Sequence, residues 1–386
     1  MPDAVIVDIA RSPIGRAFKG SLAPLRPDNT AAFIVDQLLE RNPDVDPALI
    51  EEVIAGCGLP QGRQAFNIGR IVALLSEKLP QEVNGSTVSR YCASGLDAIR
   101  IASNNVRAGQ GDAYIAAGVE FVSQYNERQE AAGPSDQNEN LQGNDGQPNV
   151  YIQMGDTAVN VAKKYGVSRE DMDKYAQRSQ ELAVESQENG FFDREIIPVD
   201  VNGTQVAKDD GPRASSSYEK LSQLPEAFEG GGGVTAGNSC PLNDGAAAAL
   251  IMSDTKAKEL GLKPRARIIT AATWGNEPEY MGVAPIGAIK KALDRAGMTI
   301  EDVDTVELNE AFAAQVIPIM DECGIPLEKM NPHGGAIALG HPFGMTGVRI
   351  MTTLLNGLES DNKTIGLETM CVAQGQGEAM IVERLS

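Results

Sequence analysis

The sequence predicts an α/β protein made of two related halves, with a loop-rich insertion in the first. Short apolar or β-branched runs alternate with longer helical patterns up to about residue 120, and the alternation resumes near residue 245. Between them the chain is polar from Gln124 to Pro148, and a second irregular stretch from Asn202 to Ser217 leads to the glycine run at 230–233. We therefore expect an N-terminal half over residues 1–117 and 243–263, an inserted domain over 118–242 and a C-terminal half over 264–386.

The first half begins with two strand and helix pairs. The expected strands cover Ala4–Asp8 and Val53–Ala55, and the expected helices cover Thr30–Arg41 and Phe66–Leu75. The insertion has helical patterns of its own, over Asp156–Tyr165 and, behind a Ser168 cap, over Asp171–Asn189.

The two halves show an internal duplication. Residues 92–101 align with residues 341–350 at a constant offset. Cys92 and His341 would then occupy equivalent strand-to-helix turns, and ligands of open α/β sheets bind at such strand ends. The alternative is that any two strand-to-helix units share glycine and apolar spacing.

Composition excludes several classes of protein. With 386 residues, 42% hydrophobic and 22% charged, the chain is typical of soluble globular proteins. It has no run of about 18 apolar residues and no signal-peptide core, so we expect no membrane insertion and a cytoplasmic location. The 53 acidic and 33 basic side chains give a net charge of −20, which disfavours nucleic acid as a partner. The five cysteines include no C-x-x-C pair, so we expect neither disulfides nor a metal site.

Cys92 is the first candidate for chemistry. It follows a β-branched segment ending at Val88 and precedes a helical pattern over Leu96–Val106. A thiol at a helix N-terminus feels the positive end of the dipole, which favours the nucleophilic thiolate. The alternative is a small, buried, inert side chain.

Both histidines lie in a glycine-rich segment between Asn331 and Gly347. His341 is flanked by Gly340 and Pro342, a rigid turn that would present the imidazole as a general base. A structural role is the alternative for His341 and the favoured interpretation for His333.

Two further segments carry polar groups at strand ends. Cys371 follows the apolar run Thr364–Met370 and precedes a glycine-rich turn, so a thiol and free backbone N–H groups can face one point, as in an oxyanion hole. Asn309 and Glu310 follow the expected strand Val306–Leu308 and are either site residues or a helix cap and a first-turn acid.

Together these segments resemble the thiolase family over nearly the whole chain. Six separated motifs match the family in order and spacing: residues 5–15, the segment around Cys92, 236–247, 309–312, 334–342 and 371–377. The resemblance implies a βαβαβαββ core repeated twice, layered as αβαβα, with a loop domain inserted in the first repeat.

The resemblance also implies roles for the candidate residues. Cys92 would carry the acyl group as a thioester, His341 would take the Cys92 proton, and Cys371 would exchange a proton with the acetyl-CoA enolate. One oxyanion hole would combine His341 with a water held by Asn309, and the other the backbone amides of Cys92 and Ala373. The substrates would be CoA and acyl-CoA, with no permanently bound cofactor, in a homodimer or homotetramer.

Three positions depart from the family pattern. Ala373 replaces the usual glycine two residues after the second cysteine. Cys240 stands in the expected helical segment Ala236–Gly245, where the family presents a serine to the pantetheine arm. Gln153 replaces the histidine of acetoacetyl-specific members, whose covering loop is also longer and more apolar.

The remaining candidate substrate contacts follow from the same resemblance. Met154, Met281 and Phe312 stand where the family places residues of the acyl pocket. Arg213 is the expected cation for the CoA phosphates.

The predicted function is therefore an acyltransferase that cleaves 3-ketoacyl-CoA with CoA, or runs the reverse condensation, and that accepts chains longer than acetoacetyl. A strictly acetoacetyl-specific enzyme is the first alternative. A decarboxylating ketoacyl synthase is disfavoured because the histidines are only eight residues apart and Cys371 is present. The intact set of Cys92, Asn309, His341 and Cys371 disfavours a silent lipid-binding relative. Chain length, reaction direction and the choice between dimer and tetramer stay open.

Overall fold

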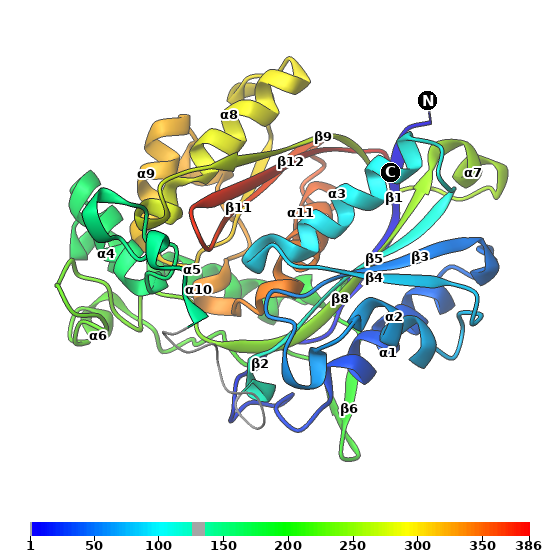
Figure 1. Ribbon diagram of the computed structural model, residues 1–386, viewed down its shortest axis with the longest axis horizontal. Helices are drawn as coiled ribbons and strands as arrows, with labels where there is room; N and C mark the ends of the chain where they lie inside the picture. Colours follow the sequence, from blue (N-terminus) through cyan, green and yellow to red (C-terminus); the bar gives the residue numbers. More distant parts are fainter. Residues whose placement is uncertain (1, 126–135) are drawn as a thin grey trace.

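The computed structural model describes residues 2–125 and 136–386 (Figure 1). Within this part of the chain, the main strands form one mixed sheet in the order β10-β11-β12-β9-β1-β8-β5-β3-β4, with β2 beside β8. The strands of the first half are β1 (Ala4–Arg11), β2 (Gly15–Arg16), β3 (Ile50–Gly56), β4 (Asn84–Val88), β5 (Ala113–Phe121) and β8 (Asn243–Ser253). Those of the second half are β9 (Ala266–Gly275), β10 (Thr305–Leu308), β11 (Ile365–Val372) and β12 (Gln376–Arg384).

The two halves of the sheet meet along a short seam. β1 pairs with β8 along its whole length, from Ala4 opposite Ser253 to Arg11 opposite Ala247. Its pairing with β9 covers only two positions, at Val5 and Ile6. The two sets of strands are therefore nearly independent sheets.

Helices cover both sets of strands and fill the space between them (Figure 1). α1 and α2 pack on the outer side of the first set, α8 and α9 on the outer side of the second, and α3 and α11 lie side by side in the centre. This arrangement confirms the α/β class and the layered, duplicated core. The helices are α1 (Pro27–Glu40), α2 (Ile68–Leu75), α3 (Ser94–Arg107), α7 (Asp254–Glu259), α8 (Pro285–Ala296), α9 (Ala313–Cys323), α10 (Ala336–Leu339) and α11 (Phe343–Ser360).

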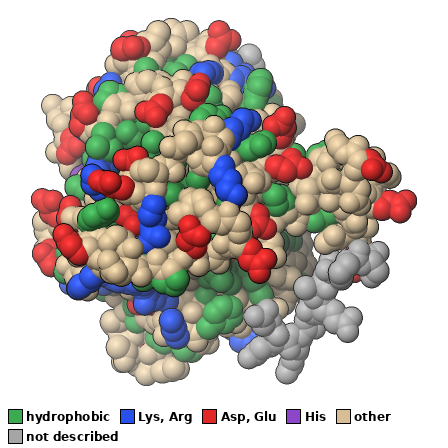
Figure 2. All heavy atoms as spheres, turned by 90° about the vertical axis from the view of Figure 1, so that its left-hand side faces the viewer, with side chains coloured by type: hydrophobic (Ala, Val, Ile, Leu, Met, Phe, Trp, Pro, Cys, Tyr) green, Lys and Arg blue, Asp and Glu red, His purple; other side chains and the backbone are tan. Residues whose placement is uncertain are grey.

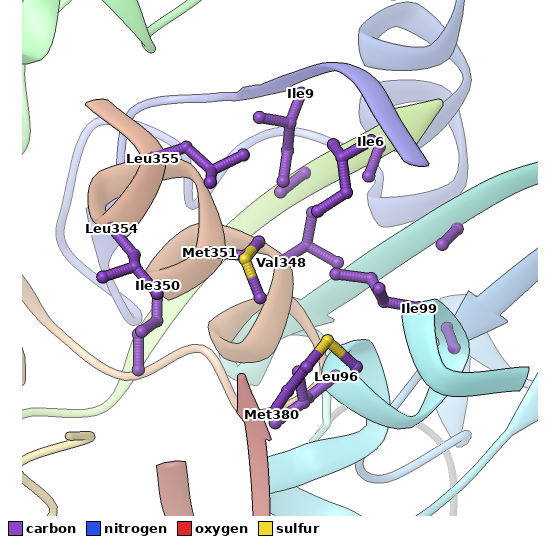
Figure 3. Close-up of a cluster of buried hydrophobic side chains, with 14 of the residues drawn as sticks. Ile6, Ile9, Leu96, Ile99, Val348, Ile350, Met351, Leu354, Leu355 and Met380 are labelled. Atoms are coloured by element: carbon purple, nitrogen blue, oxygen red, sulfur yellow. The ribbon is translucent and has the colours of Figure 1, made fainter. Parts of the chain in front are cut away.

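The central layer is built on α11, which is buried on all sides from Gly344 to Leu358. Figure 3 shows Val348 and Met351 of this helix packed with Ile6 of β1 and Ile99 of α3. A helix that is buried on every side is stable only when other elements surround it. The burial of α11 therefore holds the segment before it, which contains His341, inside the molecule.

The insertion between β5 and β8 contains the expected helices. Ser168 caps the second of them, since its Oγ accepts a hydrogen bond from the backbone N of Asp171 at 3.1 Å. Residues 126–135 of the polar stretch lie outside the described residues, and the division into three domains stays a prediction. The elements of the insertion are α4 (Met154–Tyr165), α5 (Arg169–Glu188), β6 (Val199–Val201), β7 (Thr204–Val206) and α6 (Tyr218–Leu221).

Two local expectations are wrong. The segment Ala236–Gly245 is not helical, because it is irregular up to Leu242 and then enters β8. Asn238 holds this irregular backbone by donating to the carbonyl oxygen of Gly233 at 3.0 Å, and the following Pro241 cannot continue a helix.

The second correction concerns the duplicated turn before His341. Cys92 follows β4, as expected, but His341 follows the short helix α10. The strand that would correspond to β4 is reduced to one parallel bridge between Met330 and Val306. The duplication therefore relates the helices α3 and α11 better than the segments that lead into them.

Candidate active site

Cys92 lies in a single 3-10 turn, Tyr91–Ala93, between β4 and α3. Burial raises the pKa of the Cys92 thiol well above its ordinary value, and the backbone N–H of Ala373, directed at the sulfur, opposes this rise. The expected thiolate at the helix start is therefore wrong for the resting protein. Desolvation outweighs the helix terminus, so the thiol needs a base.

Cys371 lies near the end of β11, where it pairs with Gly377 of β12. Burial raises its pKa to about 11, while an N–H of Gln315, whose Nε2 lies 3.1 Å from the sulfur, opposes the rise. Past the strand, Gln374 and Gly375 adopt positive φ values of 67° and 77°. This turn places the N–H of Ala373 toward Cys92, and Ala373 is not among the described residues with positive φ, so alanine fits there without strain.

His341 is buried, and its hydrogen bonds define its tautomer. Thr346 Oγ1 donates to the carbonyl oxygen of Pro342 at 2.7 Å, so it accepts from His341 Nδ1, which lies 2.6 Å away. Nε2 then carries the lone pair and faces Asn309 Nδ2 at 3.3 Å. Burial and the nearby Arg349 lower the pKa of His341 to about 3, so the imidazole is neutral at physiological pH. The neutral imidazole can therefore accept a proton at Nε2.

The turn before His341 requires a glycine. Gly340 has a φ of 114°, and a Cβ there would meet the side chain of Asn243 at 2.6 Å. Asn243 Oδ1 accepts from the backbone N of His341 at 2.9 Å, and its Nδ2 donates to the carbonyl oxygen of Gly15 at 3.0 Å. Asn243 of β8, which is bound to Gly15 of β2, thereby fixes the backbone of the segment that carries the His341 imidazole.

Asn309 and Glu310 are fully buried just after β10, and their side chains contact different parts of the molecule. α9 begins after Phe312, so neither residue caps a helix and that alternative is wrong. Besides its contact with His341, Asn309 has a buried Oδ1 with no partner among the described residues. Glu310 accepts from Tyr175 at 2.8 Å and from Ser179 at 2.6 Å, which ties α5 of the insertion to the core.

Comparison with known proteins agrees with this arrangement. Residues 4–255 match the thiolase N-terminal domain, and residues 262–384 match the thiolase C-terminal domain. The chain belongs to the thiolase family. It is therefore an acyltransferase that acts on acyl-CoA.

Several full-length relatives are similar to this thiolase. It is 42% identical to the 3-oxoadipyl-CoA/3-oxo-5,6-dehydrosuberyl-CoA thiolase of Escherichia coli, over 100% of both chains. It is 41% identical to the 3-ketoacyl-CoA thiolase of Bacillus subtilis, over 99% of this chain and 100% of the relative. The crystal structure of the Bacillus anthracis acetyl-CoA acetyltransferase is similar with a TM-score of 0.91 and 36% identity, over 100% of this chain and 99% of that one.

The thiolase brings most of the expected pocket residues together. Met281 and Phe312 are buried in one hydrophobic cluster with Cys371, and the partly buried Met154 and Cys240 pack against the same cluster. Burial, with Cys371 nearby, raises the pKa of Cys240 to about 12, so it is a neutral thiol.

Arg213 does not join this group of residues. Its side chain is exposed beside a surface hollow of about 500 Å³ that is also lined by Glu181, Glu185 and Glu188. Three carboxylates disfavour an anionic phosphate at this place. The side of the molecule on which α4, α6 and α9 lie carries interspersed acidic and basic side chains (Figure 2).

His333 has a packing role. Its ring stacks on Phe191, with ring centroids 3.7 Å apart and an interplanar angle of 14°. Its Nδ1 lies 3.4 Å from Ser186 Oγ on α5. His333 therefore helps to attach the insertion to the core, as the favoured interpretation held.

Gln315, Thr346 and Asn243 were not predicted as site residues from the sequence, yet each contacts a candidate catalytic side chain or its backbone. Their positions in the sequence were the available signal, because Gln315 is six residues after Asn309 and Thr346 is five residues after His341. The described residues contain no cluster of His, Cys, Asp and Glu that could hold a metal ion. The same residues include no helix long and apolar enough to cross a membrane.

Proposed function

We propose that this thiolase cleaves 3-ketoacyl-CoA with CoA through an acyl-enzyme on Cys92. The observation that carries the proposal is the backbone N–H of Ala373 directed at the Cys92 sulfur, two residues beyond the second thiol, Cys371. A nucleophile from one half and a thiol acid from the other are thereby brought to one buried point.

In the first half-reaction, the Cys92 thiol passes its proton to Nε2 of His341, and the resulting thiolate attacks the 3-keto carbon. The two charges formed lie in the same buried site, so each offsets the desolvation of the other. When the tetrahedral adduct collapses, the bond between C2 and C3 breaks and the acyl group stays on Cys92. The Cys371 thiol, protonated at neutral pH because its pKa is about 11, then protonates C2 of the enolate to release acetyl-CoA.

In the second half-reaction, the Cys371 thiolate takes the proton of incoming CoA. The CoA sulfur attacks the thioester carbonyl, and Cys92 leaves as thiolate and regains its proton from His341. The oxyanions formed in these steps would be stabilised by the N–H groups of Cys92 and Ala373 and by His341 with a water on Asn309. The unpartnered Oδ1 of Asn309 supports the place of this water.

Intact mass spectrometry and isotope exchange test these assignments. Brief incubation with acyl-CoA should give one acyl adduct, on Cys92, and Cys92→Ser should lose most turnover because a hydroxyl is a far poorer nucleophile. Cys371→Ala should still acylate Cys92 but fail to exchange the α-protons of acetyl-CoA with deuterated water. An adduct on Cys371 with Cys92 free, or normal exchange in Cys371→Ala, would refute the roles.

We also propose that the substrate chain is longer than acetoacetyl. Gln153 stands where acetoacetyl-specific members have histidine, and full-length relatives are named 3-ketoacyl-CoA and 3-oxoadipyl-CoA thiolases. Each further methylene that the Met154, Met281 and Phe312 pocket buries contributes about 0.8 kcal/mol.

The measurement is kcat/KM for acetoacetyl-CoA, 3-ketohexanoyl-CoA and 3-oxoadipyl-CoA. The last two differ in the terminal carboxylate, so their ratio separates length from charge. A kcat/KM for both longer substrates about a hundredfold below acetoacetyl-CoA, a gap of roughly 2.7 kcal/mol, would instead make this an acetoacetyl-specific enzyme.

The proposed assembly is a homodimer formed by the first-half sheets, in the cytoplasm. Support comes from the partly exposed strand β4 at the end of the sheet and from Phe66 nearby, which is 89% exposed. Arg213 stays a proposed CoA contact, although its acidic neighbours argue against it. Light scattering in moderate salt tests the assembly, and a monomer or tetramer would contradict it.

A further inference from the structure

Arg90, two residues before Cys92, reaches from the first half to the second. Its Nη1 donates to Gln376 Oε1 of β12 at 3.0 Å, and its Nε lies 3.7 Å from Glu378 Oε2 of the same strand. The same Nε donates to Asp97 Oδ2 of α3 at 3.0 Å. One guanidinium therefore joins the Cys92 segment to α3 and to β12.

The register of β12 gives this contact its meaning. Gly377 lies opposite Cys371, so Gln376 and Glu378 flank the residue that pairs with the second thiol. Arg90 is two residues from Cys92, and its guanidinium contacts Gln376 and Glu378. These two residues flank Gly377, which pairs with Cys371. Along the backbone itself, the two thiols are separated by more than half of the chain.

The acidic partners of Arg90 are buried. Asp97 is 3% exposed and Glu378 is fully buried, and Arg100 also approaches both, at 2.5 Å and 3.3 Å. Asp97 thus faces two guanidiniums at the base of the Cys92 segment, beside Glu378, whose pKa is raised well above its usual range by burial and by the nearby Asp97. Arg90 donates hydrogen bonds both to Asp97 of α3 and to Gln376 of β12, so its guanidinium holds these two elements in one relative position.

The segment that Arg90 holds has a defined shape. The backbone N of Arg90 donates to Ser94 Oγ at 2.9 Å, and Ser94 Oγ donates to the carbonyl oxygen of Tyr91 at 2.7 Å. Tyr91 has a φ of 43°, a conformation that non-glycine residues rarely adopt. A segment fixed in this way moves with Arg90 and does not adjust around it.

We infer that Arg90 is a positioning residue that sets the separation of Cys92 and Cys371. The inference rests on the proposed roles of these thiols. Cleavage of the bond between C2 and C3 needs both thiols in register, because one holds the acyl carbon while the other protonates the departing carbon. Acylation of Cys92 by a simple acyl-CoA depends less on this register, because no carbon–carbon bond breaks and Cys371 only protonates the CoA thiolate that leaves. Proton exchange on acetyl-CoA uses Cys371 as its base.

The test compares these three rates in Arg90→Gln and Arg90→Lys. Arg90→Gln should lower kcat for thiolysis about ten- to a hundredfold, since misplacement by about 1 Å costs this much, and should change KM less than about threefold. Its acylation and exchange rates should stay within about threefold of wild type. Arg90→Lys should fall between, because one ammonium cannot reach both strand acceptors and Asp97.

Gln376→Leu removes the acceptor of Arg90 Nη1 and repeats the test from the other strand, with Arg90 intact; it should lower thiolysis selectively. Arg265→Gln is the matched control: it removes an ion pair with Glu359, 2.6 Å long, at the far end of α11, and should leave all three rates unchanged. Equal loss of all three rates in both Arg90→Lys and Gln376→Leu, no loss of thiolysis in either, or selective loss in the control would overturn the inference. Absence of the Cys92 adduct or of exchange in wild type would instead refute the proposed function.

Discussion

Replacing Thr346 with valine should slow the enzyme without unfolding it. The hydroxyl of Thr346 accepts from His341 Nδ1 at 2.6 Å in a fully buried place, so valine leaves this N–H without a partner. The loss is greatest when His341 carries the proton from Cys92, because hydrogen bonds to charged groups contribute about 1.5–3 kcal/mol. At 1.36 kcal/mol for each factor of ten, acylation of Cys92 should slow about ten- to a hundredfold.

The same helix supplies the control. Thr352 is also buried and also donates to the carbonyl four residues earlier, at 2.8 Å, but it has no contact with His341. Both variants lose one buried hydroxyl, so their melting temperatures should fall similarly. The assay is the rate of adduct formation on Cys92, followed by intact mass after rapid quenching. Equal acylation rates in Thr346→Val and Thr352→Val would show that the tautomer of His341 does not depend on Thr346.

Two further predictions concern pH. The pKa of His341 is lowered from about 6.5 in the unfolded chain to about 3 in the fold, so below about pH 6.5 the unfolded state binds a proton that the native state refuses. The contribution of the neutral imidazole to stability is complete above that pH and is lost toward pH 3. The melting temperature of wild type should therefore fall more steeply from pH 6.5 to 4 than that of His341→Asn. Parallel curves for the two proteins would contradict the burial of a neutral imidazole. Gln315→Leu removes the N–H directed at Cys371, so its pKa should rise further and the pH profile of α-proton exchange should shift to higher pH, whereas an unchanged profile would exclude Gln315 from this role.

Local sequence signals predicted most of the elements, and they indicated candidate side chains whose roles stay predictions. The helix expected over Leu96–Val106 is found at Ser94–Arg107, and Asn309 does lie against His341. Glycine and proline placement and apolar periodicity are local properties, so they can be identified in the sequence. The effect of burial on charge is not local, and for this reason the pKa of Cys92 was expected in the wrong direction.

Contacts between distant segments were also beyond the sequence. Arg213 has the right charge for a phosphate, but the fold places α5 glutamates around it. Gln376 and Arg90 are 286 residues apart, and nothing near either one indicates the other. The helix expected in Ala236–Gly245 failed because a side chain from the irregular backbone, Asn238, takes part in tertiary hydrogen bonds, including one to Asp173 at 2.9 Å.

The pairing of β1 with β8 has a consequence for synthesis on the ribosome. Ala4 finds its partner only at Ser253, so β1 waits for the synthesis of nearly two thirds of the chain before it can pair with β8. At a translation rate of about 5–20 residues per second, that interval is roughly 12–50 s. During it, an apolar segment with two unpaired edges is available to other nascent chains. We expect the N-terminal segment to require chaperone protection until β8 emerges, and slower translation to lower the yield of folded enzyme.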